Sequence, residues 1–321
     1  MKPYGFKLFV LLFLYGCNQI AFGQTKTDVS QQAKKHDSSF VSIAVNFISD
    51  AIYLGRKDSI TAPYLYPSIT YFNKSGLYAS GSFSYLTKSD ESRIDLFLGT
   101  IGYDVTSKKF SGDISFTKYL FNTESYNVIS EVEADLTATI AYDFDVFNLS
   151  LILTNFFNKS SKSDFFVSSE LSHNFVTSKK NFQISPSVGV FFGSQNFYEE
   201  YYINNRFGSG RTTGSEQGSG SGQGTGQGTG GSTQTIKTTV ILKESEKFDL
   251  MAIEFSLPVW YVNKPFIVSF LPVLVIPQNP ATLTVDSEVY KEDLENTFYW
   301  MVGVSYRFKK APKFCSDKSE N

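Results

Sequence analysis

The chain lacks any run of apolar residues that is long enough to cross a membrane as a helix. Its most apolar stretch, Leu8 to Leu14, is far shorter than the roughly 18 residues that a spanning helix requires. Mean hydropathy is slightly negative, at -0.14. A helical membrane protein is therefore excluded.

Cysteine, histidine and excess positive charge are also scarce. The 321 residues include two Cys and two His, and the formal net charge is -2. If Cys17 is removed with the N-terminal segment, Cys315 is left alone, so neither an intramolecular disulfide nor a cysteine-based metal site is expected. Because no basic stripe is available to neutralise phosphates, nucleic acid is not an expected partner, and no cofactor is expected either.

The N-terminus has the features of a secretory signal peptide. Lys2 and Lys7 precede the apolar run, and the small-residue site Ala21-Phe22-Gly23 follows it, which predicts cleavage after Gly23. The alternative is a lipoprotein box at Leu14-Tyr15-Gly16-Cys17, with Cys17 retained as a lipid anchor, although Tyr15 is bulky for that pattern. Residues 1–23 are therefore expected to direct export of the chain.

The chain is rich in aromatic residues and in segments where apolar residues alternate with small or polar ones. Phe, Tyr and Trp make up 16% of the residues. Val41, Ile43, Val45 and Phe47 alternate with small or polar residues, as expected of a strand with one face toward lipid. Similar segments are Phe40 to Ile48, Tyr64 to Phe72, Leu77 to Leu86, Arg93 to Val105, Phe110 to Phe121, Val128 to Tyr142, Val146 to Phe157, Phe165 to Val176, Phe182 to Phe192, Phe248 to Tyr261, Phe266 to Ile276 and Phe298 to Phe308. About 12 such segments predict an all-β fold, a transmembrane antiparallel up-and-down β-barrel.

The connections between these segments alternate between short and long. Tight turns are expected at Asn73 to Gly76, Ser107 to Lys109, Asp143 to Asp145, Ser178 to Lys180 and Asn263 to Pro265. Longer connections are Asp50 to Pro63, Asn122 to Asn127, Asn158 to Asp164, Gly193 to Lys247 and Gln278 to Asn296. Short turns on one side and long loops on the other predict a bacterial outer-membrane protein with both termini in the periplasm.

The predicted organisation follows from these boundaries. Residues 24–38 form a polar periplasmic leader, 39–308 the barrel, and 309–321 a disordered periplasmic tail. Residues 208–235 are a Gly, Ser, Thr and Gln tract, expected to be a flexible extracellular loop because it has too few apolar residues to fold. The last strand ends in Phe308 and resembles the signal read by the barrel assembly machinery, so that machinery and outer-membrane lipids are expected partners.

One region resembles a known family. Ser49-Asp50-Ala51-Ile52-Tyr53-Leu54-Gly55-Arg56 leads through Pro63 to Ser68-Ile69-Thr70-Tyr71, and then to Ser75-Gly76-Leu77-Tyr78-Ala79-Ser80. This order resembles the opening of the TorF-type porins over about the first third of the mature chain, although Gly55-Arg56 stands in reversed order. The resemblance implies a barrel with a channel role and brings no substrate with it.

Strand alternation assigns the residues that face the lumen. Because Ile94, Leu96 and Leu98 form an apolar face, Arg93, Asp95 and Phe97 are expected to point inward. The complete expected lumen set is Arg93, Asp95, Asp113, Glu131, Glu133, Asp135, Glu170, Glu254 and Arg307. A net acidic lumen predicts a narrow channel for small cationic or polar solutes. The alternative is a plugged barrel that conducts nothing, in which the acids pair with Arg93, Arg307 and hydroxyl groups, and which presents a surface loop or docks a surface or periplasmic protein.

Three further candidate sites have weaker support. Tyr198, Glu199, Glu200, Tyr201 and Tyr202 would form a surface patch for carbohydrate or protein, or would simply extend two strands above the membrane. Asp113 and the segment Glu131 to Asp135 could together bind a divalent cation.

His173 lies between Ser172 and Asn174, and Ser, His and Asn are also the set of residue types that outer-membrane phospholipases use. Consecutive residues of a strand, however, face opposite sides. No enzyme is therefore expected, and a hydrolase is the remote alternative.

Overall fold

The computed structural model describes residues 39–58, 60–88, 91–159, 162–203, 240–243, 245–285, 288–292 and 294–308. The predictions made for residues 1–23, 24–38, 208–235 and 309–321 lie outside these described residues. No helix in the described ranges is long and apolar enough to cross a membrane.

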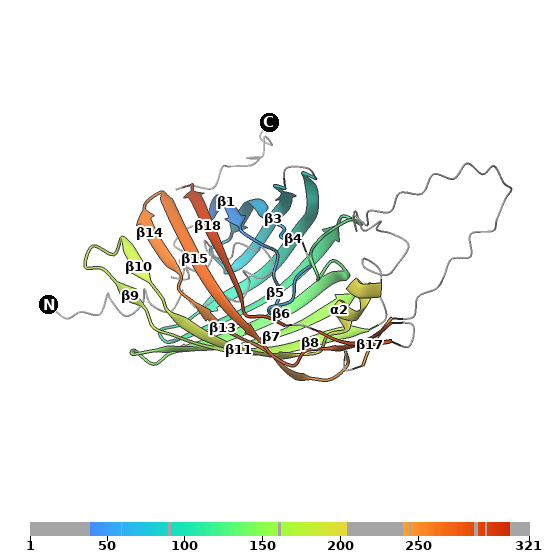
Figure 1. Cartoon of the computed structure of the whole chain (residues 1–321). Coiled ribbons are helices and arrows are strands. Elements are labelled where there is room, and N and C mark those ends of the chain that lie inside the picture. Colours follow the sequence, from blue (N-terminus) through green and yellow to red (C-terminus); the bar gives the residue numbers. More distant parts are fainter. Residues whose placement is uncertain are drawn as a thin grey trace, which may run out of the picture.

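The described chain consists mainly of antiparallel strands that close into a barrel (Figure 1). The elements are β1 (Phe40–Ile48), β2 (Tyr64–Phe72), β3 (Leu77–Leu86), β4 (Arg93–Thr106), β5 (Phe110–Phe121), β6 (Val132–Asp143), β7 (Asn148–Asn158), β8 (Ser163–Ser172), β9 (Phe175–Val176), β10 (Phe182–Ile184), β11 (Ser187–Gly193), α2 (Asn196–Tyr201), β12 (Val240–Leu242), β13 (Asp249–Ser256), β14 (Val259–Asn263), β15 (Phe266–Pro277), β16 (Thr282–Val285), β17 (Glu288–Lys291) and β18 (Thr297–Arg307). β1 pairs with β18 and β13 pairs with β15, so the main sheet has no open seam between its first and last strands. The prediction of a closed 12-strand antiparallel barrel is confirmed.

Three barrel strands are interrupted, at the β8–β9, β10–β11 and β13–β14 junctions. Pro186 and Pro258 lie at two of these junctions, and Pro272 is on the neighbouring β15. Their carbonyl oxygens accept hydrogen bonds from the backbone N–H groups of His173, Ser185 and Leu257, respectively. Because proline donates no backbone hydrogen bond, a row of three on adjacent strands explains why the ladder is interrupted there.

Side chains alternate between a polar inner face and an apolar outer face. On β4, Thr100 is 6% exposed and points inward, whereas the neighbouring Ile101 is 62% exposed. The outward aliphatic belt includes Ile43, Val45, Ile69, Ile101, Ile114, Leu136, Ile140, Leu151, Leu153, Val302 and Val304. A continuous exposed apolar belt of this kind would be unstable in water and is typical of a barrel that faces lipid.

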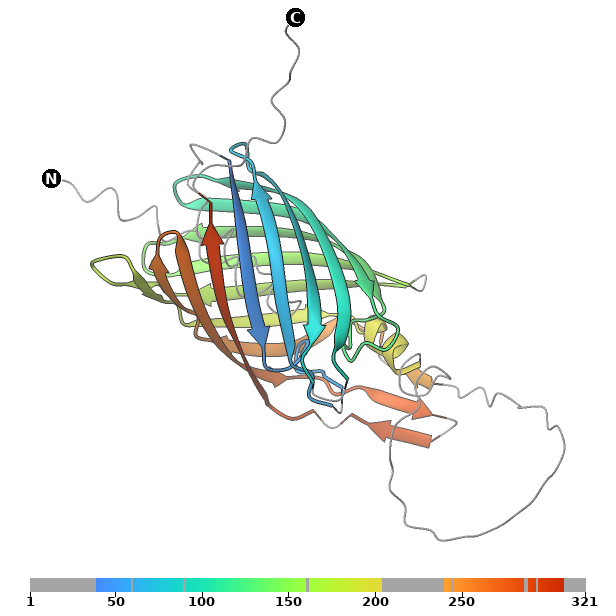
Figure 2. The same ribbon diagram turned by 90° about the horizontal axis from the view of Figure 1, so that it is seen from above.

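The two ends of the barrel differ, and we call them the turn end and the loop end. The turn end carries the short β-hairpin turns between β2 and β3, β4 and β5, β6 and β7, β9 and β10, and β14 and β15. The loop end carries α2 and the β16–β17 hairpin, which projects beyond the barrel wall (Figure 2). Outward aromatic side chains surround the turn end, namely Tyr71, Tyr103, Phe110, Tyr142, Phe144, Phe147, Phe175, Phe182, Tyr261 and Phe266.

A stack of planar groups lines the inner wall at the turn end. The Phe40 and Phe72 ring centroids lie 5.4 Å apart with the rings 11° from parallel, and Phe72 and Tyr78 are stacked at 5.8 Å. The Arg307 guanidinium carbon lies 3.6 Å from the Phe40 ring centroid. Tyr78 fits because its partner across the ladder is Gly102, where an added Cβ would lie 2.4 Å from the Tyr78 ring.

This packing predicts that alanine destabilises the fold at one glycine of β4 and not at another. Gly102→Ala should lower the free energy of unfolding by about 1–3 kcal/mol, because the new methyl group displaces the Tyr78 ring from its stack. The matched control is Gly99→Ala, where no atom lies within 4 Å of an added Cβ, and no destabilisation is expected there. Equilibrium urea unfolding of both variants in detergent micelles is the measurement, and equal stability of the two would contradict the stacking account.

Candidate functional site

The loop-end half of the barrel is filled by apolar and aromatic side chains, which we call the plug. They come from the connections between β1 and β2 and between β5 and β6, and from α2, and comprise Ala51, Ile52, Tyr53, Leu54, Ala62, Tyr126, Val128, Ile129, Phe197, Tyr198 and Tyr201. They pack on inward side chains of the wall, such as Tyr64, Leu96, Phe166 and Tyr299. The plug therefore occupies the end of the lumen where the long connections meet.

Tyr53 shows that the connection between β1 and β2 crosses the lumen. Its ring lies 5.8 Å from that of Phe156 on β7 and 5.7 Å from that of Phe166 on β8, measured between centroids. Strands β1 and β7 are on opposite walls, because six steps separate them in either direction around 12 strands. Twelve strands about 4.8 Å apart and tilted by about 40° give a barrel roughly 24 Å across, so this connection must extend deep into the interior.

A single arginine fastens this connection to the other loops. Arg56 is 1% exposed, and its Nε donates to Gln195 Oε1 at 3.0 Å. Its terminal nitrogens donate to the carbonyl oxygens of Leu54, Gln278 and Asn279, at 3.2, 3.4 and 3.3 Å. The Glu292 carboxylate lies 3.9 Å away and offsets the buried charge. Arg56 thus joins the first connection to α2 and to the connection between β15 and β18.

The plug residues around Arg56 are shielded from solvent. Burial lowers the pKa of the Arg56 guanidinium, while the nearby Glu292 carboxylate acts in the opposite direction. Burial likewise raises the pKa of the Tyr53 and Tyr198 hydroxyls well above the ordinary value. All three shifts have the same first cause, because burial disfavours the charged form of each group.

Asp164 holds α2 against the wall. It is 0% exposed, and its two carboxylate oxygens accept four hydrogen bonds. Oδ1 accepts from Ser194 Oγ at 2.6 Å and from the Asn196 backbone at 2.7 Å. Oδ2 accepts from the Phe197 backbone and from Asn158 Nδ2, both at 2.8 Å. A carboxylate with this set of donors fixes the start of the helix and, with it, Phe197 and Tyr198 in the plug.

Outside the plug, the inner wall carries a continuous row of polar side chains, which we call the hydroxyl row. Cross-strand pairing from β6 to β18 aligns Asp135, Thr117, Thr100, Ser80, Thr70, Ser42 and Arg307. Neighbours in the row bond to one another, with 3.0 Å between the Thr70 and Ser80 hydroxyls and 3.1 Å between those of Thr100 and Thr117. The row runs from Asp135, near the loop end of β6, to Arg307, at the turn end of β18.

Of the β4 residues that were predicted to face the lumen, Asp95 does so and Phe97 does not. Asp95 is buried, and it accepts hydrogen bonds from Tyr64 Oη at 2.6 Å, Ser125 Oγ at 2.5 Å and Arg93 Nε at 3.2 Å. The expected orientation of Phe97, Leu96 and Leu98 is wrong. Asp95 is the extra residue of a β-bulge opposite Ser84 and Tyr85, so the parity changes after it, and Phe97 faces outward while both leucines face inward.

A second bulge changes the assignment on β6. Glu133 is skipped in the pairing with β7 and points outward, where its carboxylate lies 3.1 Å from Lys118 Nζ, so its predicted lumen position is wrong. Glu131 lies before β6 begins, in a connection, and is 3.4 Å from Lys159 Nζ. Asp135 does face inward, and it accepts from Tyr119 Oη at 2.6 Å and Thr137 Oγ1 at 2.7 Å.

The remaining predicted lumen residues are nearer the turn end. Asp113 is buried, with Tyr78 Oη 3.4 Å away. Glu170 and Glu254 flank Gly189 in the ladder, on β8 and β13, so that both carboxyl groups project over a residue without a side chain. Arg307 is half-buried against Phe40. The acids therefore do not form one ring. Asp95 and Asp135 lie near the loop end, whereas Asp113, Glu170 and Glu254 lie nearer the turn end.

The patch from Tyr198 to Tyr202 is not a surface patch. Tyr198 and Tyr201 are buried in the plug, and the Tyr201 hydroxyl donates to Asp58. Glu199 accepts from the Leu242 backbone at 3.1 Å and Ser245 Oγ at 2.9 Å, and Glu200 is half-buried. The expectation of exposure failed because these residues form α2, whose apolar side turns inward.

The other candidate sites are not assembled. Asp113 pairs with Thr139, four positions along β6 from Asp135, so it does not join the segment Glu131 to Asp135. Among the described residues, no group of three or more His, Cys, Asp or Glu could hold a metal ion. The His173 Nδ1 bonds to the Val146 carbonyl oxygen, at the turn end, and in the described part of the chain no hydroxyl group bonds to this ring.

Sequence reasoning missed the two residues that organise the plug, Arg56 and Asp164. Arg56 follows Ala51-Ile52-Tyr53-Leu54-Gly55, and an apolar run inside a connection that should be solvated was the available signal. Asp164 gave no signal, because its partners Ser194, Asn196 and Phe197 lie about 30 residues away along the chain.

Comparisons with known proteins assign the chain to no family. No protein-family model matches the chain, and no curated protein matches it significantly. A solved KdgM porin is 11% identical with a TM-score of 0.41, covering 83% of this chain and 99% of that one. A NanC porin is 8% identical with a TM-score of 0.44, covering 83% and 98%, and LpxR from Salmonella typhimurium is 7% identical with a TM-score of 0.45, covering 83% and 99%. The resemblance to TorF-type porins therefore stays a prediction.

The bonding of Asp164 predicts a specific effect on α2. Asp164→Ala should lower the free energy of unfolding by about 2–4 kcal/mol, because buried donors lose their acceptor. It should also speed hydrogen exchange at the backbone amides of residues 196–201. The control is Asp249→Ala, whose partly exposed carboxylate pairs with Lys247 and should contribute no more than about 1 kcal/mol. Unchanged exchange in α2 would show that Asp164 does not hold the helix.

Proposed function

We propose that the protein is an outer-membrane channel for small polar solutes, with cations preferred, and that the plug closes it at the loop end. The observation that carries this proposal is the division of the interior into two halves. The turn-end half is lined by the hydroxyl row and by carboxylates, whereas the loop-end half is filled by a connection that folds inward. The structure would then correspond to the closed state of the channel.

The location in a membrane is supported by the outer face of the barrel. Exposed aliphatic side chains form its middle, and exposed aromatic rings surround the turn end. At the loop end, Phe97, Phe157, Phe165, Phe192, Phe248 and Phe298 are exposed as well. Two aromatic girdles around an aliphatic belt are typical of outer-membrane barrels. The proposal assigns the short turns to the periplasm.

The preference for cations is supported by the charges that remain in the turn-end half. Asp113, Glu170 and Glu254 point toward the interior there, and Arg307 lies at the far end against Phe40. Carboxylates in a confined space of low dielectric constant attract cations and repel anions. Glu133 faces outward and is therefore not one of the carboxylates that would attract cations into the interior.

The plug is suited to opening because non-covalent contacts hold it. Arg56 provides five polar contacts to three separate parts of the chain, and the aromatic rings supply the remaining packing. A set of contacts centred on one residue can be released as a unit. Small changes at Arg56 would therefore shift the balance between closed and open states.

The second candidate function is a barrel that conducts nothing and carries surface structure. It is favoured by the burial of the inward side chains and by the β16–β17 hairpin, which extends beyond the loop end (Figure 2). Under this alternative the plug would be a permanent core. The two functions differ in whether weakening the plug produces an open pore.

Weakening the arginine contacts should open the channel. In planar bilayers the wild-type protein should show rare openings, and Arg56→Met should raise the open probability by about tenfold or more, because the charge-assisted hydrogen bonds of the closed state are lost. The control is Lys57→Met, which removes the charge of the neighbouring residue. The Lys57 side chain is 46% exposed, and its ion pair with Asp50 is long, at 3.8 Å. That variant should conduct like the wild type.

A stronger variant separates the two functions. Residues 51–61 are replaced by a Gly-Ser linker, and circular dichroism establishes that the barrel still forms. If this folded variant carries no current, the channel proposal is wrong and the surface-structure function stands.

Selectivity should depend on the inward carboxylates only. Glu170→Gln combined with Glu254→Gln should move the reversal potential under a salt gradient toward zero, because two acidic side chains leave the path. Glu133→Gln is the matched control, since this residue is exposed on the outer face, and its reversal potential should stay at the wild-type value. Equal shifts in both variants, or no shift in the first, would contradict an acidic lumen as the source of selectivity.

A further inference from the structure

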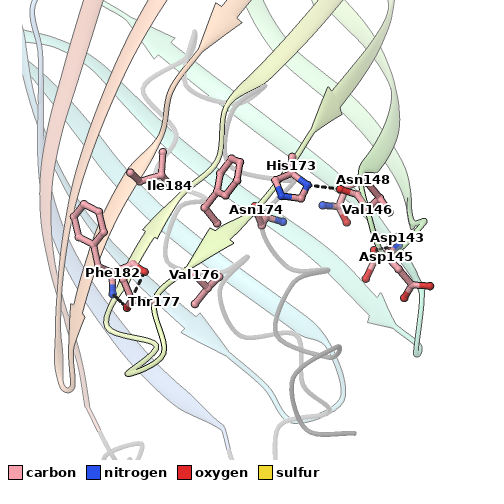
Figure 3. Close-up of a pocket in the computed structure, with 11 residues that line it drawn as sticks. Asp143, Asp145, Val146, Asn148, His173, Asn174, Val176, Thr177, Phe182 and Ile184 are labelled. Carbon is pink, nitrogen blue, oxygen red and sulfur yellow. Dashed lines mark hydrogen bonds between the residues drawn. The ribbon is translucent and has the colours of Figure 1, made fainter. Parts of the chain in front are cut away.

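The barrel wall has a gap at the turn end, between the β6–β7 turn and the β9–β10 hairpin, which we call the notch (Figure 3). It is a cavity of about 670 Å³, a volume in the usual range of ligand pockets. Its lining includes the buried Asn148 on the inner side and Phe175, 57% exposed, on the outer side. Residues of both faces of the wall therefore border the same cavity.

The notch exists because one hairpin extends beyond its neighbour. The last residue pair between β7 and β8 is Asn148 with Ser172. The next residue, His173, donates its backbone N–H to the Pro186 carbonyl oxygen, and the chain then continues as β9. In the described chain β9 pairs only with β10, so it is the edge strand of the main sheet. The His173 ring bonds to the Val146 carbonyl oxygen across the upper side of the gap (Figure 3).

The free edge of β9 presents backbone groups to the notch. The Thr177 N–H donates to the Phe182 carbonyl oxygen at 3.0 Å, so Thr177 and Phe182 form a hydrogen-bonded pair of the hairpin. The preceding pair, Val176 with Gln183, is then of the non-hydrogen-bonded kind. The N–H and C=O groups of Val176 therefore point away from β10, toward the cavity. Exposed edges of this kind are the sites at which a further strand can pair.

Buried polar atoms without hydrogen-bond partners occur on the strands that border the notch and next to them. They are Asn148 Oδ1, Ser172 Oγ, Ser185 Oγ and Gln183 Nε2, in side chains that are 1%, 6%, 3% and 4% exposed. Asn148 itself lines the cavity. A buried donor or acceptor left unpaired destabilises the fold, so the unpaired Asn148 Oδ1 in the cavity lining indicates a polar ligand that supplies the missing bond.

The lining also restricts the chemistry of that ligand. Val146, Phe175, Val176, Phe182 and Ile184 are apolar, and Asp143 and Asp145 lie at the side of the β6–β7 turn. None of the lining residues that the structure describes is Lys or Arg, and the nearby Lys109 is bonded to Asp145 at 2.6 Å. A phosphate group would meet carboxylates without a cation to bind it, which disfavours a phospholipid.

We propose that the notch binds an extended polypeptide segment of a partner protein, which adds a strand to the free edge of β9. Backbone groups of the segment would bond to Val176, and its amides would satisfy Asn148 Oδ1. Its apolar side chains would pack on Phe175 and Phe182, and a basic residue would lie beside Asp143 and Asp145. Strand addition of this type takes its affinity from backbone hydrogen bonds and its specificity from alternate side chains.

The test measures binding of a fluorescent probe peptide, Lys-Thr-Val-Thr-Val-Thr, to the full-length protein in detergent micelles by fluorescence anisotropy. Val176→Pro removes the N–H that faces the notch and leaves the β9–β10 bonds at Thr177 intact, so it should weaken binding by about tenfold or more. Val176→Thr keeps the N–H and should bind like the wild type. Asn148→Leu is a second variant, which removes the buried amide and should also weaken binding.

A control peptide carries N-methyl groups on alternate amides, which keeps the side chains and blocks the pairing edge, and it should not bind. Equal binding of both peptides, or wild-type affinity of Val176→Pro, would overturn the proposal. So would the absence of peptide binding, whether or not a dansyl-labelled phosphatidylethanolamine binds in its place. Binding of that lipid with sensitivity to Asn148→Leu would instead identify the notch as a lipid site.

Discussion

The pairing of β1 with β18 is the constraint on which the other features depend. Residues from Ser42 to Ile48 form a continuous ladder with residues from Arg307 to Met301. A sheet closed in this way has to tilt its strands, so that residues aligned across the ladder lie at successive heights along the barrel. The hydroxyl row and the stack of Arg307, Phe40, Phe72 and Tyr78 both follow from that geometry, since each crosses the closing seam or ends at it.

Closure also separates the interior into regions with different chemistry. Near the loop end, apolar side chains of the wall such as Leu96 and Phe166 face inward and match the apolar connection that fills the space. Toward the turn end, Ser and Thr predominate on the inner face, and the described connections are short turns. The barrel is therefore packed like a small globular core at one end and lined like a polar passage at the other.

Local sequence patterns predicted the strands well and the interior less well. Alternation and turn residues are encoded within about 10 neighbouring positions, so the number of strands and the two kinds of connection could be read directly. A bulge adds one residue without changing local polarity, and for this reason Phe97 and Glu133 were assigned to the wrong face. The plug depends on contacts such as Tyr53 with Phe156, about 100 positions apart, and no periodicity reports such a contact.

The tilt of the hydroxyl row has a stereochemical consequence. Because the row climbs one strand at a time around the wall from Arg307 to Asp135, its hydrogen-bonding groups trace a path of one fixed hand. Under the channel proposal, a polar solute that moves along this path meets a chiral arrangement of hydrogen-bonding groups. Mirror-image solutes of equal size and charge would therefore interact unequally with the row.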